Sequence, residues 1–151
     1  MATTTQNISR TTHLLALMKK GDDAFNSRDV AGMKATHHPE MISHIPGIEL
    51  IHGQPAHAKM IEAMFRTFPD IHVVNDPYPI QFGSGDWTTV ITRATGTFTG
   101  EMILPNGKVI APTGKAFDVT FATTAKWDGD LLIEEFVSLD SPLQAQQIGL
   151  A

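Results

Sequence analysis

The chain has 151 residues, of which 42% are hydrophobic and 18% charged, and it carries a formal net charge of −5 and no cysteine. This composition is typical of a globular domain, and no apolar run approaches the roughly 18 residues of a membrane helix, so we expect no membrane association. The negative charge and the scattered basic residues argue against a nucleic-acid-binding surface. A polar N-terminus without a signal-peptide pattern, together with the lack of cysteine, predicts a cytoplasmic protein without disulfides.

The first part of the chain predicts three helices. Apolar residues at helical spacing indicate a helix over residues 8–27, after a flexible tail of residues 1–7. Asp29 can cap a second, shorter helix. Pro55 suits the first turn of a third helix, which we expect to end before Pro69.

The remainder of the chain predicts strands rich in Val, Ile, Thr and Phe. We expect them over residues 71–75, 87–102, 108–110 with 115–127, and 131–139. The dipeptides Asn106-Gly107 and Asp128-Gly129 favour two-residue hairpins and so predict antiparallel pairing of consecutive strands. Helices followed by such strands indicate a single α+β domain over residues 1–151, with one layer of helices on one face of a sheet.

Several short sequence words support a more specific assignment. They are F-P-D at 68–70, G-T-F-T-G-E at 96–101, P-T-G-K at 112–115, W-D-G-D-L-L-I-E-E-F at 127–136, Asp140, and Q-Q-I-G at 146–149. In this order and spacing they resemble the SnoaL-like polyketide cyclase family, within the NTF2-like superfamily, over about residues 10–150. The resemblance implies a cone, in which three N-terminal helices close the mouth of a strongly curved antiparallel sheet around an apolar pocket. It also implies a homodimer paired through the outer face of the sheet.

Asp118 lies in the run G-K-A-F-D-V-T-F, which otherwise suits the interior of a strand. The best-known family members cyclise aromatic polyketides by intramolecular aldol condensation without metal or organic cofactor, and the resemblance implies that Asp118 is their acid/base aspartate. In an apolar pocket, desolvation would raise its pKa towards neutrality. Strand alternation leaves open which face Asp118 occupies, and the alternative is an exposed carboxylate paired with a cation such as Arg93.

Further pocket residues also follow from the resemblance. His44 lies where relatives often have a pocket-facing histidine, and we expect it to assist Asp118; the alternative is a hydrogen-bonded histidine under the helices. Phe98 replaces the histidine of the family word G-T-H-x-G, and Phe136 replaces a frequent tryptophan, so the family's substrate is not expected here. The expected substrate-binding residues are Phe65, Trp87, Arg93, Phe98 and Phe136.

Other titratable residues predict no metal site. Five histidines lie between residues 37 and 57, but none of them forms a helical i, i+4 pair, and the sequence has neither cysteine nor an H-E-x-x-H motif. We therefore expect neither a metal nor another cofactor. Glu134 and Glu135 are adjacent on a predicted strand, so they should point to opposite faces, and one of them can point inward.

Three functional interpretations follow. The first is a cofactor-independent acid/base enzyme that acts on an apolar, carbonyl-bearing small molecule, with polyketide cyclase-like aldol or related proton-transfer chemistry. The second is a hydratase or epoxide hydrolase, known elsewhere in the superfamily, which would need Asp118 near Arg93 and a bound water. The third is a protein that binds a hydrophobic small ligand without turnover, which Phe98 in place of the family histidine favours.

Overall fold

Helices form most of the N-terminal part of the chain and strands most of the remainder in the computed structural model, which describes residues 3–151. The helices are α1 (Thr4–Asn26), α2 (Val30–Thr36), α3 (Gln54–Thr67) and α4 (Ser141–Gln147). The strands are β1 (His37–His44), β2 (Ile51–His52), β3 (His72–Val73), β4 (Ile80–Ser84), β5 (Trp87–Thr97), β6 (Met102–Ile103), β7 (Val109–Ile110), β8 (Ala116–Asp128) and β9 (Leu131–Leu139). Helices followed by a sheet confirm the predicted α+β class. None of these helices is both long and apolar enough to span a bilayer.

The N-terminal helices begin at residues with clear capping chemistry. Thr3 and Gln6 form a reciprocal capping box at the start of α1. Residues 4–7 therefore form the first turn of α1 instead of the expected flexible tail, and residues 1–2 lie outside the described chain. As predicted, Asp29 caps α2, because its Oδ1 accepts a hydrogen bond from the Gly32 amide at 2.9 Å.

The main sheet is mixed. Its strand order is β2-β1-β9-β8-β5-β3, and β4 also pairs with β5. The hairpin β8–β9 is antiparallel, as its Asp128-Gly129 turn predicts, and β4–β5 is antiparallel too, whereas β1 and β9 run parallel. The expectation of a wholly antiparallel sheet is wrong for this pair. Most of the chain separates β1 from β9, so no short turn determines their relative direction.

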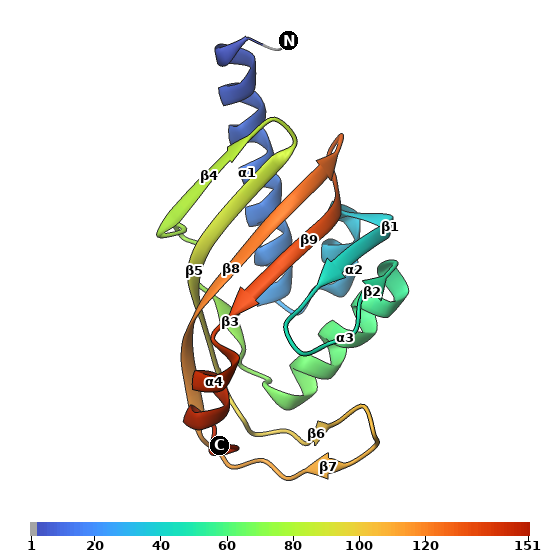
Figure 1. Cartoon of the computed structure of the whole chain (residues 1–151), viewed down its shortest axis with the longest axis vertical. Helices are drawn as coiled ribbons and strands as arrows, with labels where there is room; N and C mark the ends of the chain where they lie inside the picture. Colours follow the sequence, from blue (N-terminus) through green and yellow to red (C-terminus); the bar gives the residue numbers. More distant parts are fainter. Residues whose placement is uncertain (1–2) are drawn as a thin grey trace.

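The helices cover one face of the sheet, which we call the inner face. Figure 1 shows α1 passing behind β4, β5 and β8, with α2 and α3 beside β1. Side chains along β8 alternate accordingly. Phe117, Val119, Ala125 and Trp127 are buried on the inner face, whereas Ala116, Asp118, Thr120 and Lys126 are exposed on the opposite, outer face.

The fold also contains two elements that the sequence did not predict. β4 is the strand before Trp87, and α4 is a short helix after the sheet, which contacts β8. Asp140 caps α4, since its Oδ1 accepts a hydrogen bond from the Leu143 amide at 3.1 Å. β6 and β7 form a separate two-stranded arm that extends away from the main sheet (Figure 1).

An aromatic cluster anchors the inner face near α3. Phe98 is fully buried, and its ring centroid lies 5.8 Å from that of Phe68. Phe68 in turn packs edge-on against Phe117 with the centroids 5.1 Å apart. Phe98 therefore contributes to the stability of the fold through packing.

Removing this ring should destabilise the protein strongly. We expect Phe98→Ala to lower the free energy of unfolding by about 3 to 5 kcal/mol, because a large aromatic side chain leaves a cavity that the surroundings fill only in part. Urea denaturation measures the change. Ile103→Ala on the exposed β6–β7 arm is the control and should change stability by less than about 1 kcal/mol; equal effects of the two substitutions would contradict this account of the core.

Candidate functional site

A cavity of about 260 Å³ lies between the helices and the inner face of the sheet. Its wall is mostly apolar and includes Met18, Phe25, Met60, Met64, Phe68 and Trp127. Three of these residues come from α3 and the position that follows it, so one apolar side of this helix forms part of the wall. A wall of this kind suits a small, largely apolar molecule.

Asp22 brings a carboxyl group into this apolar wall. It lies four residues after Met18 on α1 and so continues the buried stripe of the helix. The Tyr78 hydroxyl donates a hydrogen bond to Oδ2 of Asp22 at 2.5 Å. Asp22 is partly accessible and lines the cavity, and protein atoms surround its carboxyl group.

Burial sets the protonation of this pair. Desolvation, opposed by the Tyr78 hydrogen bond and reinforced by the charge of Glu135, raises the pKa of Asp22 to about 7. Burial and the nearby Asp22 charge also raise the pKa of Tyr78, so the phenol stays protonated and remains a donor. Asp22 can therefore take up or release a proton near neutral pH.

A second polar group surrounds Glu135 on β9. Its Oε1 accepts a hydrogen bond from the Ser43 hydroxyl at 2.7 Å and lies 3.3 Å from Nε2 of His57. His37 stacks on His57 with the ring centroids 5.0 Å apart, and its Nδ1 lies 2.7 Å from the Met33 carbonyl oxygen. β1, α3 and β9 thus bring His37, His57 and Glu135 together at the wall of the cavity.

Glu135 in this second cluster has a different protonation state from Asp22. Burial tends to raise the pKa of Glu135, but the hydrogen bond and charge of His57, with His37 and Ser43, outweigh it and hold the pKa below its usual value. Burial lowers the pKa of His37, against the opposing charge of Glu135. Near neutral pH the cavity therefore contains an ionised Glu135 and a partly protonated Asp22.

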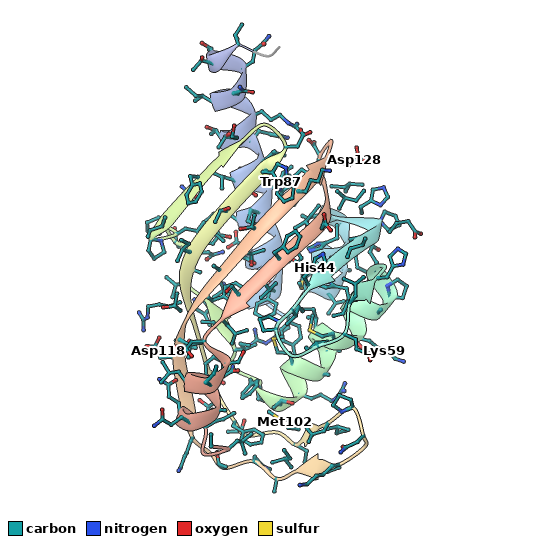
Figure 2. The ribbon with its side chains drawn as sticks, viewed as in Figure 1. His44, Lys59, Trp87, Met102, Asp118 and Asp128 are labelled. Atoms are coloured by element: carbon teal, nitrogen blue, oxygen red, sulfur yellow. The ribbon has the colours of Figure 1, made fainter. Side chains whose placement is uncertain are left out.

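Asp118 does not lie in this cavity. It is on the outer face next to α4, as Figure 2 shows, and its side chain is 49% exposed. Arg93 forms a two-point ion pair with its carboxylate, with Nε donating to Oδ1 at 2.9 Å and Nη2 to Oδ2. The Arg93 hydrogen bond lowers the pKa of Asp118. The expected pocket position and raised pKa are therefore wrong, because the bulky neighbours Phe117 and Val119 are buried on the inner face.

The outer face also holds His44, which was expected to assist Asp118. His44 Nε2 lies 3.0 Å from Oε2 of Glu134, and its ring stacks on Phe136 with the centroids 4.2 Å apart. Phe136 and Trp87 are themselves exposed there. These residues and Arg93 were expected to contact a substrate in the pocket, but none of them lines the cavity.

The two remaining expected substrate contacts belong to the core. Phe98 is fully buried against Phe68 and does not line the cavity. Phe65 packs on Phe25 with the ring centroids 5.1 Å apart. The Arg28 guanidinium lies over the Phe65 ring, 4.7 Å from its centroid. These rings support the fold instead of lining the cavity.

The sequence contained signals for some of the polar residues that do line the cavity. Asp22 follows Met18 by four residues, and His57 precedes Ile61 by four, so each extends an apolar helical stripe. The expectation that one of the adjacent Glu134 and Glu135 points inward is confirmed for Glu135. Nothing in the sequence indicated that these residues meet.

The chain matches a model of a known protein family. The model described as SnoaL-like polyketide cyclase matches residues 16–148. A comparison with curated proteins finds no match.

Solved structures with a similar fold cover nearly the whole chain. A protein of Jannaschia sp. CCS1, provisionally described as a SnoaL-like polyketide cyclase, has a TM-score of 0.81 at 19% identity and covers 93% of this chain and 94% of its own. TsrD from Streptomyces laurentii has a TM-score of 0.77 at 19% identity, covering 93% and 97%. AclR from Streptomyces galilaeus, provisionally described as a hydroxylase, has a TM-score of 0.77 at 17% identity, covering 93% and 87%. Identities this low show a shared fold only.

The raised pKa of Asp22 predicts a specific dependence of stability on pH. The folded chain binds this proton more tightly than the unfolded chain, so stability is lost as the pH rises from about 4 to about 7. Between pH 5 and pH 8, we expect the free energy of unfolding of the wild type to fall by about 2 to 3 kcal/mol more than that of Asp22→Asn. Denaturant titrations at the two pH values measure this difference. The control Asp118→Asn should retain the wild-type pH dependence over this range. If the unfolding free energy of Asp22→Asn also changed with pH as that of the wild type does, Asp22 would not titrate as described.

Proposed function

The chain belongs to the SnoaL-like polyketide cyclase family, and we propose that it is an acid/base enzyme acting on an apolar small molecule that bears carbonyl groups. The proposed chemistry is intramolecular aldol cyclisation or a related proton transfer next to a carbonyl. The observation that carries the proposal is the Asp22 carboxyl group, which has a pKa of about 7 in the wall of an otherwise apolar cavity. A pKa near the working pH suits a group that must both accept and return a proton.

Asp22 would act first as a base and then as an acid. Its ionised form would remove a proton from the carbon next to one carbonyl, which leaves an enolate. The enolate carbon would attack a second carbonyl of the same molecule, forming a carbon–carbon bond and an alkoxide. Protonated Asp22 would return the proton to that oxygen and regain its starting state. The Tyr78 hydrogen bond to Oδ2 orients the carboxyl group, so Oδ1 would be the oxygen that exchanges the proton with the substrate.

The hydratase or epoxide hydrolase interpretation receives less support. Arg93 and Asp118 are paired, as that interpretation requires, but both side chains are about half exposed on the outer face. A molecule bound in the cavity would not reach them within one protomer. Ligand binding without turnover is the competing use of the cavity, and the test of the acid/base role separates the two.

We also propose that two copies of the chain pair through the outer face. Apolar side chains from β4, β5 and β9 are exposed there, namely Ile80, Phe82, Trp87 and Phe136. Burying such side chains against a second copy is favourable, and a two-fold axis would bury the same patch on both protomers.

Carbon–hydrogen exchange tests the acid/base role without knowledge of the natural substrate. In D2O, we expect the wild type to accelerate exchange of the protons next to the carbonyl of α-tetralone, an apolar aryl ketone, because Asp22 removes them reversibly. Proton NMR follows the loss of the signal. Asp22→Asn should lower the catalysed rate about 100-fold or more, a typical contribution of a positioned acid/base group.

Asp118→Asn is the matched control and should retain the rate within about twofold, since Asp118 lies outside the cavity. A wild type that α-tetralone stabilises thermally without any exchange would support ligand binding alone. Loss of exchange in Asp118→Asn but not in Asp22→Asn would indicate that Asp118 on the outer face is the catalytic residue, and it would refute the proposal.

The pairing of subunits can be tested independently. We expect the wild type to elute as a dimer in size-exclusion chromatography with light scattering, and Phe82→Asp to elute as a folded monomer, because the substitution places two charges in the interface across the axis. Ile103→Asp on the exposed β6–β7 arm should remain dimeric. A monomeric wild type, or a dimeric Phe82→Asp, would contradict the proposed interface.

A further inference from the structure

His37, His57 and Glu135 lie far apart in the sequence and meet at the cavity wall. One nitrogen or oxygen atom from each residue lies within 4.8 Å of the corresponding atoms of the other two. From this arrangement we propose that the three side chains form a binding site for a divalent transition-metal ion such as Zn²⁺. The proposal is contrary to the expectation from sequence, and it does not depend on the reaction proposed for Asp22.

The separation of the ligand atoms suits a shared cation. Two ligands of a tetrahedral Zn²⁺, each about 2.0 to 2.2 Å from the ion, lie about 3.3 to 3.5 Å apart. Nε2 of His57 and Oε1 of Glu135 are separated by 3.3 Å. This separation matches that of two ligands around one ion, which would replace the direct contact between His57 and Glu135.

Neighbouring hydrogen bonds hold the ligands in the form that binds metal. The Met33 carbonyl oxygen can only accept a hydrogen bond, so Nδ1 of His37 carries the proton and Nε2 keeps its lone pair. The Ser43 hydroxyl similarly fixes the carboxylate of Glu135. Bonds of this kind orient histidine and carboxylate ligands in known metal sites.

The charge of the buried Glu135 also calls for a cation. A buried carboxylate is stable only with compensating charge and hydrogen bonds. The groups that stabilise it are His57, His37 and Ser43, and none of them carries a permanent positive charge. A divalent ion would supply the charge and use both histidines, and two imidazoles with one carboxylate are a common donor set for Zn²⁺ and Fe²⁺.

A metal ion at this site could also bind a molecule in the cavity. All three side chains line the cavity, so an ion that they bind keeps coordination positions open to its interior. A carbonyl or carboxylate oxygen of a molecule in the cavity could occupy such a position. The chemical class of ligand is therefore an oxygen donor attached to a small apolar body.

Metal binding by the purified chain tests the proposal directly. After removal of metals with EDTA and dialysis, the wild type is titrated with ZnCl₂ in a calorimeter, and with CoCl₂ while visible absorption is recorded. We expect one Zn²⁺ per chain with a micromolar or tighter Kd, and Co²⁺ spectra with nitrogen and oxygen ligation. Glu135→Gln should weaken Zn²⁺ binding about 100-fold or more. Glu134→Gln is the matched control, because this adjacent carboxylate pairs with His44 on the outer face, and it should retain wild-type affinity.

A second measurement on the wild type covers the case in which Glu135→Gln does not fold. Zn²⁺ should shift the ring nitrogen resonances of His37 and His57 in long-range proton–nitrogen NMR spectra and leave those of His44 unchanged. The proposal is overturned if the wild type takes up no Zn²⁺, if Glu134→Gln and Glu135→Gln bind equally, or if only other histidines shift. None of these readouts depends on catalysis, so failure of the metal site and failure of the Asp22 reaction are distinguishable.

Discussion

The alternation of side chains along β8 and β9 is the constraint on which the cavity and the placement of its charged groups depend. Successive residues of a strand point to opposite faces, so burying Phe117 and Val119 under the helices places Asp118 on the outer face. The same rule on β9 turns Glu135 inward and Glu134 outward. A slip of one residue in the pairing would exchange the two faces. The large apolar residues therefore determine the face, and the carboxylates follow.

Inside the cavity, local partners give two buried carboxyl groups different charge states. Asp22 has one neutral donor, Tyr78, and desolvation dominates, whereas Glu135 has Ser43 and two histidines, which together outweigh desolvation. The groups are also coupled, because the negative charge of Glu135 contributes to the raised pKa of Asp22. A cation that neutralises Glu135 would consequently lower the pKa of Asp22. The proton chemistry and the proposed metal site thus share one electrostatic environment.

The family resemblance predicted the fold better than it predicted the residues of the site. The order of short sequence words predicted the family, and the match over residues 16–148 confirms it, although the solved structures described above are no more than 19% identical. Many sequences can satisfy the same pattern of turns and buried faces. The resemblance did not predict which residues line the cavity, since His44 and Asp118 face away from it. Chemistry belongs to individual side chains and has to be argued from them.

The sequence by itself determined the α+β class, the strand 131–139, the cap at Asp29, the place of Pro55 in the first turn of α3, and the opposite orientation of Glu134 and Glu135. These features depend on local propensity and periodicity, which a short window of residues contains. Only the tertiary structure decided the parallel pairing of β1 with β9, the face occupied by Asp118, and the meeting of residues 37, 57 and 135. Each depends on which distant segment packs alongside, and desolvation, which sets the pKa of Asp22, exists only once those segments have enclosed it.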